Sequence, residues 1–211
     1  MTDQANQKES SDNYRKVVPE VQEVLKNNIA LQFVGTLTEL PPSAWSYGLT
    51  YSVSKQNAKE VFRRLRDEKD FRFSMLIDIT AVDWMDKREP RFDVVYQLLS
   101  VEMVHRLSIK IAVDEDKPEL DSVRSLWPAA NFLEREVFDM YGITFEGHGD
   151  LRRILLYDEF VGYPLRKDYP IRAKQPRVPL RVPELRNTSA DMHRGDLVSL
   201  PVRQRLTSTQ K

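Results

Sequence analysis

Cysteine is absent from this chain of 211 residues. Without a thiol the protein has no disulfide, no thiolate zinc site, no cysteine-ligated iron–sulfur cluster and no cysteine nucleophile. A chain of this length buries roughly 70% of the surface that its unfolded form exposes, so a stable fold requires neither a disulfide nor a metal. The sequence therefore excludes the functional classes that depend on cysteine chemistry.

Long apolar runs are also missing. The longest stretch without a charged residue, Leu40 to Ser54, contains two prolines and is shorter than the ~18 residues of a membrane-spanning helix. Residues 1–12 are polar and contain no apolar segment of the kind found in secretory signals. We expect residues 1–14 to be a disordered lead-in and the protein to be soluble and intracellular.

Glycine and histidine are scarce, with seven and three copies. The glycines form neither a dinucleotide-binding nor a phosphate-binding loop, and Gly147-His148-Gly149 lacks both a third glycine and a preceding apolar strand. His148 and Asp150 are an incomplete set of metal ligands, which favours a structural role. No serine combines a nucleophile elbow with a histidine partner. The sequence offers no coherent catalytic set.

The spacing of apolar residues predicts a globular domain over residues 15–145. The expected strands cover residues 29–37, 45–53, 71–79, 92–99 and 107–113, the last two forming a hairpin. The expected helices cover residues 17–26, 55–65 with Ser54 as N-cap, 118–126, and 131–141 ended by Gly142. Because the strands come in runs, the predicted fold class is α+β: a two-layer α/β domain with a mixed or antiparallel sheet of about five strands.

A long extended proline-rich C-terminal segment is predicted over residues 146–211. Five prolines lie between Pro164 and Pro183, and proline at this density holds a chain extended because it donates no ladder or helix hydrogen bond. Large apolar residues recur between them, which favours docking along a surface over disorder. Residues 171–211 carry nine Lys and Arg against three Asp and Glu, so a basic arm of net charge +6 follows an acidic body of −6.

Charged residues are densest in and after the helix predicted over 131–141. Arg135 and Asp139 are four positions apart and face one another on a helix, which fits an ion pair. The expected buried stripe of this helix is Leu133, Val137, Phe138 and Tyr141. Charges held near such a stripe need partners because desolvation is costly. The candidates for structural ion pairs are Glu134, Arg135, Glu136 and Asp139.

Two blocks of sequence resemble a known family. The first runs from Glu134 to Ile154: Glu-Arg-Glu, an Asp three residues on, two apolar or aromatic residues, then a His and an Arg at fixed spacing. It resembles the signature of the 30 kDa subunit, also called the C subunit, of the proton-pumping NADH:quinone oxidoreductase (respiratory complex I). The block Gly-Tyr-Pro-Leu-Arg-Lys-Asp-Tyr-Pro over 162–170 resembles the second block of that family. One departure is Gly149, where the family usually has proline.

The resemblance implies a non-catalytic structural subunit of the peripheral arm, in its unfused bacterial form. Such subunits have an α+β fold with an extended C-terminal segment and hold no cofactor; FMN and iron–sulfur clusters belong to partner subunits. The implied partners are the quinone-site subunit (the D subunit) and its iron–sulfur neighbours, at the cytoplasmic face of the inner membrane. Membrane contact would be indirect, nucleic acid would not be bound, and electron transfer with proton translocation would belong to the whole complex.

Within this family, we expect basic side chains to meet carboxylates of a partner and tyrosines to serve as aromatic anchors. The interface candidates are Arg152, Arg153, Tyr163, Arg166, Lys167 and Tyr169. Arg152 and Arg153 have an alternative, which is to pair internally with Glu134, Glu136 or Asp139. Two alternative functions also stay open: the equivalent subunit of a hydrogenase-type or ferredoxin-dependent complex, and an RNA-binding protein with a basic tail.

Overall fold

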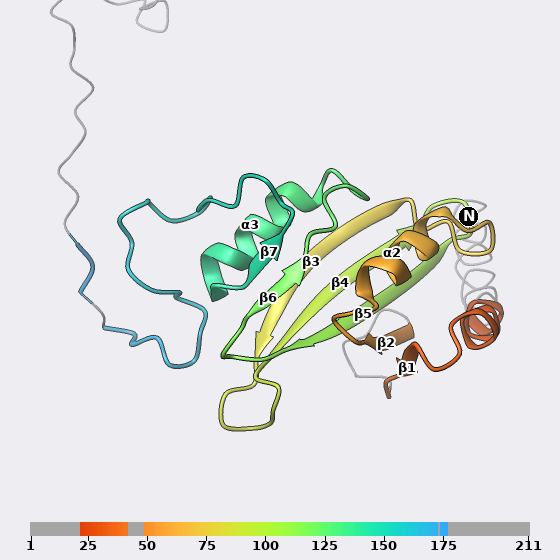
Figure 1. The fold of residues 1–211 in the computed structure, drawn as a ribbon, viewed down its shortest axis with the longest axis horizontal. Coiled ribbons are helices and arrows are strands. Elements are labelled where there is room, and N and C mark those ends of the chain that lie inside the picture. The colour runs from red at the N-terminus through yellow and green to blue at the C-terminus, as the bar shows by residue number, and fades with distance from the viewer. Residues whose placement is uncertain (1–21, 42–48, 173, 177–211) are drawn as a thin grey trace, which may run out of the picture. The chain divides into compact units, whose positions relative to one another are not determined.

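The computed structural model describes residues 22–41, 49–172 and 174–176. The chain divides into two compact units, Met1–Gln175 and Pro176–Lys211. The first contains a five-stranded mixed sheet of order β1-β2-β5-β4-β3 (Figure 1). Its strands are β1 (Leu37–Glu39), β2 (Leu49–Val53), β3 (Met75–Asp83), β4 (Phe92–Ser100) and β5 (His105–Val113). The α+β class and the sheet of about five strands are confirmed.

Strands β4 and β5 form the predicted hairpin at the centre of this sheet. They pair antiparallel from Phe92↔Val113 to Ser100↔His105. β3 continues the antiparallel pairing on the other side of β4, and β2 pairs parallel with β5. The sheet is therefore mixed, with its one parallel pair between β2 and β5.

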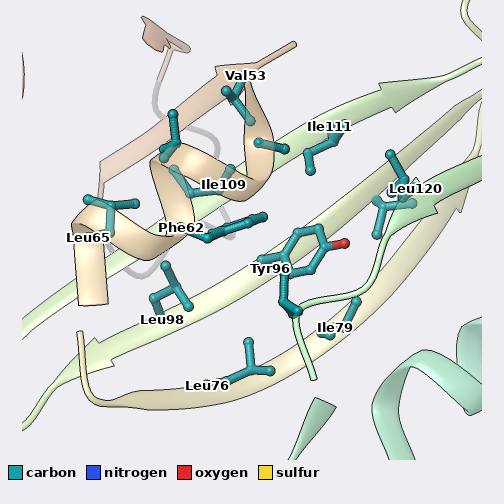
Figure 2. Packing of buried hydrophobic residues seen from close by; sticks show 14 of the residues in the cluster. Val53, Phe62, Leu65, Leu76, Ile79, Tyr96, Leu98, Ile109, Ile111 and Leu120 are labelled. Atoms are coloured by element: carbon teal, nitrogen blue, oxygen red, sulfur yellow. The ribbon is translucent and has the colours of Figure 1, made fainter. Parts of the chain in front are cut away.

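Helix α2 (Ala58–Asp67) covers one face of the sheet and closes the core (Figure 2). Its buried residues are Ala58, Val61, Phe62 and Leu65, as the helical spacing predicted. The ring of Phe62 lies 4.6 Å from that of Tyr96 on β4 and 5.9 Å from that of Trp127. The predicted cap was wrong: Asn57 precedes the helix, and it makes no side-chain capping hydrogen bond.

The strand predicted over 29–37 is wrong. The backbone is helical over residues 22–32 and becomes a strand only at Leu37, so the helix does not stop at Asn27-Asn28. Leu25, Ile29 and Phe33 are all buried, four residues apart. The helical spacing of buried residues thus continues into the segment 29–37, whose apolar pattern also fits a strand. The beginning predicted at residue 17 lies outside the described residues, as do Trp45 and Tyr47 of the next predicted strand.

Strand β3 begins later than predicted because its pattern contains a break. Phe71 and Phe73 lie before the strand and are fully buried. The register with β4 shifts between Leu76 and Asp78, as at a β-bulge. A bulge places an extra residue in one strand and interrupts the alternation. Leu76 and Ile79 therefore enter the core, while Met75 is exposed.

The helix predicted over 118–126 is also wrong. The chain forms strand β6 (Glu119–Asp121), which pairs parallel with β7 (Thr144–Glu146). Pro118 and Glu146 extend this pairing, since the Pro118 carbonyl accepts from Thr144 N–H and the Glu146 carbonyl accepts from Ser122 N–H. These backbone partners lie more than twenty residues away, so local spacing did not indicate them.

Helix α3 (Ala130–Tyr141) ends at Gly142, as predicted, with the glycine in the left-handed conformation at φ 75°. Its buried face differs from the predicted stripe, because Glu134 and Asp139 are fully buried while Leu133, Phe138 and Tyr141 are only partly so. Two carboxyl groups inside the domain require internal partners. Those partners define the candidate site.

Candidate subunit interface

Residues 147–176 follow β7 as an irregular segment, called the strap below; the structure describes all of it except residue 173. Figure 1 shows it in cyan and blue, leaving the end of β7 beside α3. A backbone hydrogen bond joins the strap to α3, from Leu165 N–H to the Met140 carbonyl oxygen at 3.1 Å. The strap contains every interface candidate that the sequence proposed.

Asp139 of α3 is the main attachment point. One carboxylate oxygen accepts the backbone N–H groups of Ile154, Leu155 and Leu156 at 2.8 to 3.1 Å. The other accepts Nη1 of Arg153 at 2.7 Å. Burial by itself raises the pKa of Asp139, but these hydrogen bonds and the nearby guanidinium lower it below its ordinary value. The carboxylate therefore stays ionised and holds the first turn of the strap.

Arg153 continues this attachment from the strap side. Its Nη2 donates to the carbonyl oxygens of Phe160 and Gly162 at 3.0 and 3.1 Å. The guanidinium also lies over the rings of Phe160 and Tyr163, at 5.7 and 5.5 Å from their centroids. Arg153 thus closes the strap on itself and pairs internally with Asp139, one of the two outcomes left open by the sequence.

The helical spacing predicted an ion pair between Arg135 and Asp139. The two side chains do not pair in the structure. The Nε and Nη2 of Arg135 donate to the carbonyl oxygens of Arg152 and Arg153, at 3.0 and 2.9 Å. Arg152 directs its own side chain into solvent beside Asp150, 3.2 Å away. Glu136 is exposed. Arg135 and Asp139 therefore find their partners in the strap and not on the next turn of the helix.

Tyr163 and Arg166 pack against the end of α3. A Cβ added to Gly142 would lie 2.5 Å from Cε2 of Tyr163, so only glycine fits there without displacing the ring. Arg166 donates from Nε to the Tyr141 carbonyl oxygen at 2.5 Å, and its guanidinium lies over the rings of Tyr163 and Phe92. Both candidates thus face the body of the domain.

A buried arginine, Arg91, anchors the strap to the sheet. It donates to both carboxylate oxygens of Asp83 at the end of β3, to Glu115, and to Asp168 of the strap at 2.7 Å. Asp83 also accepts the backbone N–H of Lys167 at 2.8 Å. Burial raises the pKa of Asp83, but these hydrogen bonds outweigh it and bring the value to about 2.

The last part of the strap is held by aromatic stacking. Tyr169 stacks on Phe160 with ring centroids 6.0 Å apart, above Gly162. Gln175 donates to the Tyr169 hydroxyl and to the Val161 carbonyl oxygen, and accepts the Val161 N–H. The strap therefore has internal order as far as residue 175.

The outward surface of the strap combines large apolar side chains with charges of both signs, since Asp158 and Glu159 are exposed as well as Lys167. Lys167 joins Arg152 in pointing its side chain to solvent, although the backbone of Lys167 is held by Asp83. Leu155 and Val161 are 61% and 65% exposed. The other exposed large apolar residues of the strap are Tyr157, Leu165 and Ile171. Four of the six candidates thus turn inward, and apolar residues that the sequence analysis did not select take their place outside.

Sequence reasoning missed Arg91 and Asp83 because nothing in their local pattern separates them from surface charges. Asp83 is the last residue of β3, Arg91 lies just before β4, and Asp168 lies 77 positions after Arg91. One available signal was the position of Asp83 at the end of an apolar alternation, where a buried carboxylate needs a cation. Of the exposed apolar residues of the strap, Leu165 and Ile171 belong to the predicted apolar anchors, and Leu155, Tyr157 and Val161 do not.

An α+β domain with an ordered strap that exposes several large apolar side chains is typical of proteins that bind other proteins. No group of three metal-ligating side chains, and no helix long and apolar enough to cross a membrane, occurs within residues 22–41, 49–172 and 174–176. The family model described as "Respiratory-chain NADH dehydrogenase, 30 Kd subunit" matches residues 51–175, from within β2 to the penultimate residue of the strap. The chain belongs to this family, which confirms the resemblance of the two sequence blocks.

Individual relatives carry related names. The protein named as the C subunit of NADH-quinone oxidoreductase in Roseiflexus sp. (strain RS-1) is 45% identical over 127 residues, which are 60% of this chain and 72% of that protein. The protein of the same name from Geobacter metallireducens is 45% identical over 58% of this chain and 75% of its own. A chain in the solved structure of an archaeal membrane-bound sulfane sulfur reductase shares the fold, with a TM-score of 0.53 at 24% identity over 75% of this chain and 86% of its own.

Proposed function

We propose that this chain is the 30 kDa (C) subunit in the peripheral arm of a proton-translocating NADH:quinone oxidoreductase and that it acts as a non-catalytic brace. In this proposal NADH is oxidised and quinone reduced at FMN, iron–sulfur clusters and a quinone site held by other subunits. Family membership and the names of the curated relatives support the complex. The structural role rests on the strap.

The observation that carries this proposal is that the strap turns several charged side chains inward and several apolar side chains outward. Arg153, Arg166 and Asp168 point inward and pair with the domain, while Leu155 and Val161 point outward. A segment that docked only on its own domain would bury its apolar side chains, because each buried apolar side chain contributes about 1.5 to 3 kcal/mol. An ordered strap with exposed apolar residues is therefore suited to a second surface.

The proposed partner surface is an apolar groove with an acidic rim. Lys167 is exposed between Leu165 and Ile171, and Arg172 and Lys174 are exposed just after Ile171. The arm over 171–211 has a net charge of +6. Within the complex, the proposed partners are the quinone-site (D) subunit and its iron–sulfur neighbours. The chain would then lie at the cytoplasmic face of the inner membrane and contact the membrane only through these proteins.

The proposal is tested by charging the outward face of the strap. The double variant Leu155→Asp and Val161→Asp should lower co-purification of the peripheral arm and NADH:quinone turnover together, about tenfold or more, because it places two carboxylates against an apolar and acidic surface. Leu31→Asp is the matched control, since Leu31 is 77% exposed on the helix over 22–32. Normal assembly of the double variant would contradict the proposal.

Deleting residues 171–211 tests the basic arm separately. The truncated chain should fold, since the residues of the domain core lie before the strap, although it loses the hydrogen bonds of Gln175 to Val161 and Tyr169. We expect impaired assembly and lower turnover. Retention of RNA by the isolated full chain, lost at high salt, would instead support the RNA-binding alternative.

A further inference from the structure

The turn that joins β4 to β5 is made largely of apolar residues. It consists of Val101, Glu102, Met103 and Val104, called the tip below. Val101 and Val104 are each 61% exposed, and Met103 is 38% exposed. Hairpin turns are ordinarily built from Gly, Asn, Asp, Pro and Ser, which accept both the turn geometry and the contact with water. The tip therefore places three large apolar side chains where a hairpin usually has polar ones.

Val104 adds backbone strain to this exposure. Its φ is 55°, in the left-handed region that a β-branched side chain rarely adopts. Glycine or asparagine would take the same φ at lower cost and would expose less apolar surface. Because the side chain of Val104 is mostly exposed, packing within the domain does not offset this strain. Strained residues concentrate at functional sites, so the tip is a candidate binding site.

Two contacts fix the tip on the domain. Ser100 is fully buried, and its hydroxyl accepts the Met103 N–H at 3.4 Å. Arg72, which precedes β3, donates to the carboxylate of Glu102 and offsets its charge. A loop that is already ordered loses less conformational freedom on binding than a mobile one. The tip is thus presented as a preformed apolar projection.

Apolar and basic residues continue from the tip onto one face of the sheet. Leu99 pairs with Met75 on β3 and with Arg106 on β5, so these three side chains form a row on one face. Met75 is 48% exposed, and Ile77 is 42% exposed. Arg106 is exposed and makes no ion pair in the part of the chain that the structure describes. The surface beside the tip is therefore apolar, with an unpaired positive charge at its edge.

The tip lies at the opposite end of β4 from the anchor of the strap. β4 begins directly after Arg91, which binds Asp168 of the strap, and ends at Ser100, directly before the tip. A strand of nine residues spans about 26 Å, at roughly 3.3 Å per residue. Contacts at two separated places fix the orientation of a subunit, which a single contact does not.

Three kinds of occupant can be compared for the tip. Loops that enter a membrane surface carry aromatic residues or clusters of Lys and Arg, whereas the tip has neither and has Glu102 between its apolar residues. A stable dimer of this chain would need about 20 to 30 residues on each side, many more than this patch contains. A pocket on another protein suits a small apolar projection, and a carboxylate at its rim would pair with Arg106.

We infer that the tip is a second docking point, which inserts its three apolar side chains into an apolar pocket of another subunit with a carboxylate for Arg106 at the rim. The inference rests on the proposed function, since it names a further contact within the same complex. The patch is too small to hold a partner alone. Attachment through the strap makes the second contact intramolecular and so raises its effective concentration.

The test is competition between two chains during assembly. The unmodified chain and a variant are co-expressed with different tags, and their ratio in the purified complex is divided by their ratio in the unassembled pool. The double variant Val101→Ser and Val104→Asn should lower this relative incorporation about three- to tenfold. The isolated variant should nevertheless unfold at the same or a higher temperature, because asparagine accepts the left-handed φ. The opposite directions separate binding from folding.

Two control variants accompany this test. Val34→Asn removes a valine that is 79% exposed outside the patch, and it should leave relative incorporation unchanged. Arg106→Glu should lower relative incorporation about two- to fivefold, as expected for an exposed ion pair. Lys59→Glu, at an exposed position of α2, is the matched control for this charge and should have no effect. Equal incorporation of Arg106→Glu would overturn the carboxylate at the rim.

A photo-reactive amino acid in place of Val101 identifies the occupant in the assembled complex. An adduct with another subunit would support the inference. Adducts only with a second copy of this chain, or only with lipid, would overturn it, as would normal incorporation of the double variant. Absence of the unmodified chain from the complex would contradict the proposed function and, with it, this inference, so the two failures are distinguishable.

Discussion

The sheet core and the strap are held together by opposite kinds of interaction. Under α2, aromatic and aliphatic side chains such as Phe62, Tyr96 and Ile109 pack on one another with almost no exposed surface (Figure 2). The strap is fixed by Asp139, Arg153 and backbone hydrogen bonds, while its apolar residues face outward. The side chains of the core are thus stabilised mainly by apolar burial, and the strap mainly by hydrogen bonds and ion pairs that leave apolar side chains exposed.

The largest expected effect comes from removing an aromatic ring from the core. Phe62→Ala should lower the free energy of unfolding by about 3 to 5 kcal/mol, because the ring is fully buried against Tyr96 and Trp127. Chemical denaturation followed by circular dichroism measures this loss. The matched control is Phe132→Ala, an exposed phenylalanine at the start of α3, which should change stability by less than ~0.5 kcal/mol. Equal losses in the two variants would contradict the role given to burial.

Asp139→Asn should affect the strap more than the core. The amide group of asparagine places donors among the three backbone N–H groups and removes the charge that Arg153 pairs with. We expect a loss of about 2 to 3 kcal/mol, together with faster tryptic cleavage in the strap.

Asp158→Asn is the control for this change, since Asp158 is an exposed carboxylate of the strap and should leave cleavage unchanged. If Asp139→Asn accelerated hydrogen exchange in β4 and β5 as much as in the strap, the two regions would be one cooperative unit and the comparison would fail.

Gly142→Ala should have the smallest effect of the three. Two costs combine: the left-handed φ of 75° and the overlap of the new Cβ with the ring of Tyr163. Gly35→Ala has the φ cost alone, because nothing lies within 4 Å of its Cβ position at φ 71°. We expect about 1 kcal/mol for Gly35→Ala and about 2 kcal/mol for Gly142→Ala in thermal unfolding. Equal shifts would mean that Tyr163 moves aside freely.

Local patterns predicted the elements that need no distant partner. The nearly continuous apolar run over 92–99 and the alternation over 107–113 identified β4 and β5, and helical spacing identified α2 and α3, because each pattern lies within its own segment. Segments 29–37 and 118–126 were mistaken because short apolar runs fit a strand and a helix equally well. Tertiary contacts decided them: Phe33 packs on Phe71, and Leu120 pairs with Phe145.

The candidate site shows the same division. The two sequence blocks led to the family and to the strap, since their charges and aromatics are fixed in order and spacing. The partner of each charge was not accessible in this way. Arg135 and Asp139 are neighbours on a helix face, yet both bind the strap, because backbone groups brought there by the fold compete with a side chain one turn away.

By itself, the sequence determined the α+β class, the absence of cysteine chemistry, the family, and the division into an acidic body and a basic arm. These follow from composition, periodicity and ordered motifs, which are properties of the chain. Only the tertiary structure decided which charges are buried and which apolar residues are left outside. Burial and pairing depend on groups up to 84 residues apart, such as Asp83 and the backbone of Lys167, and no local pattern encodes that proximity.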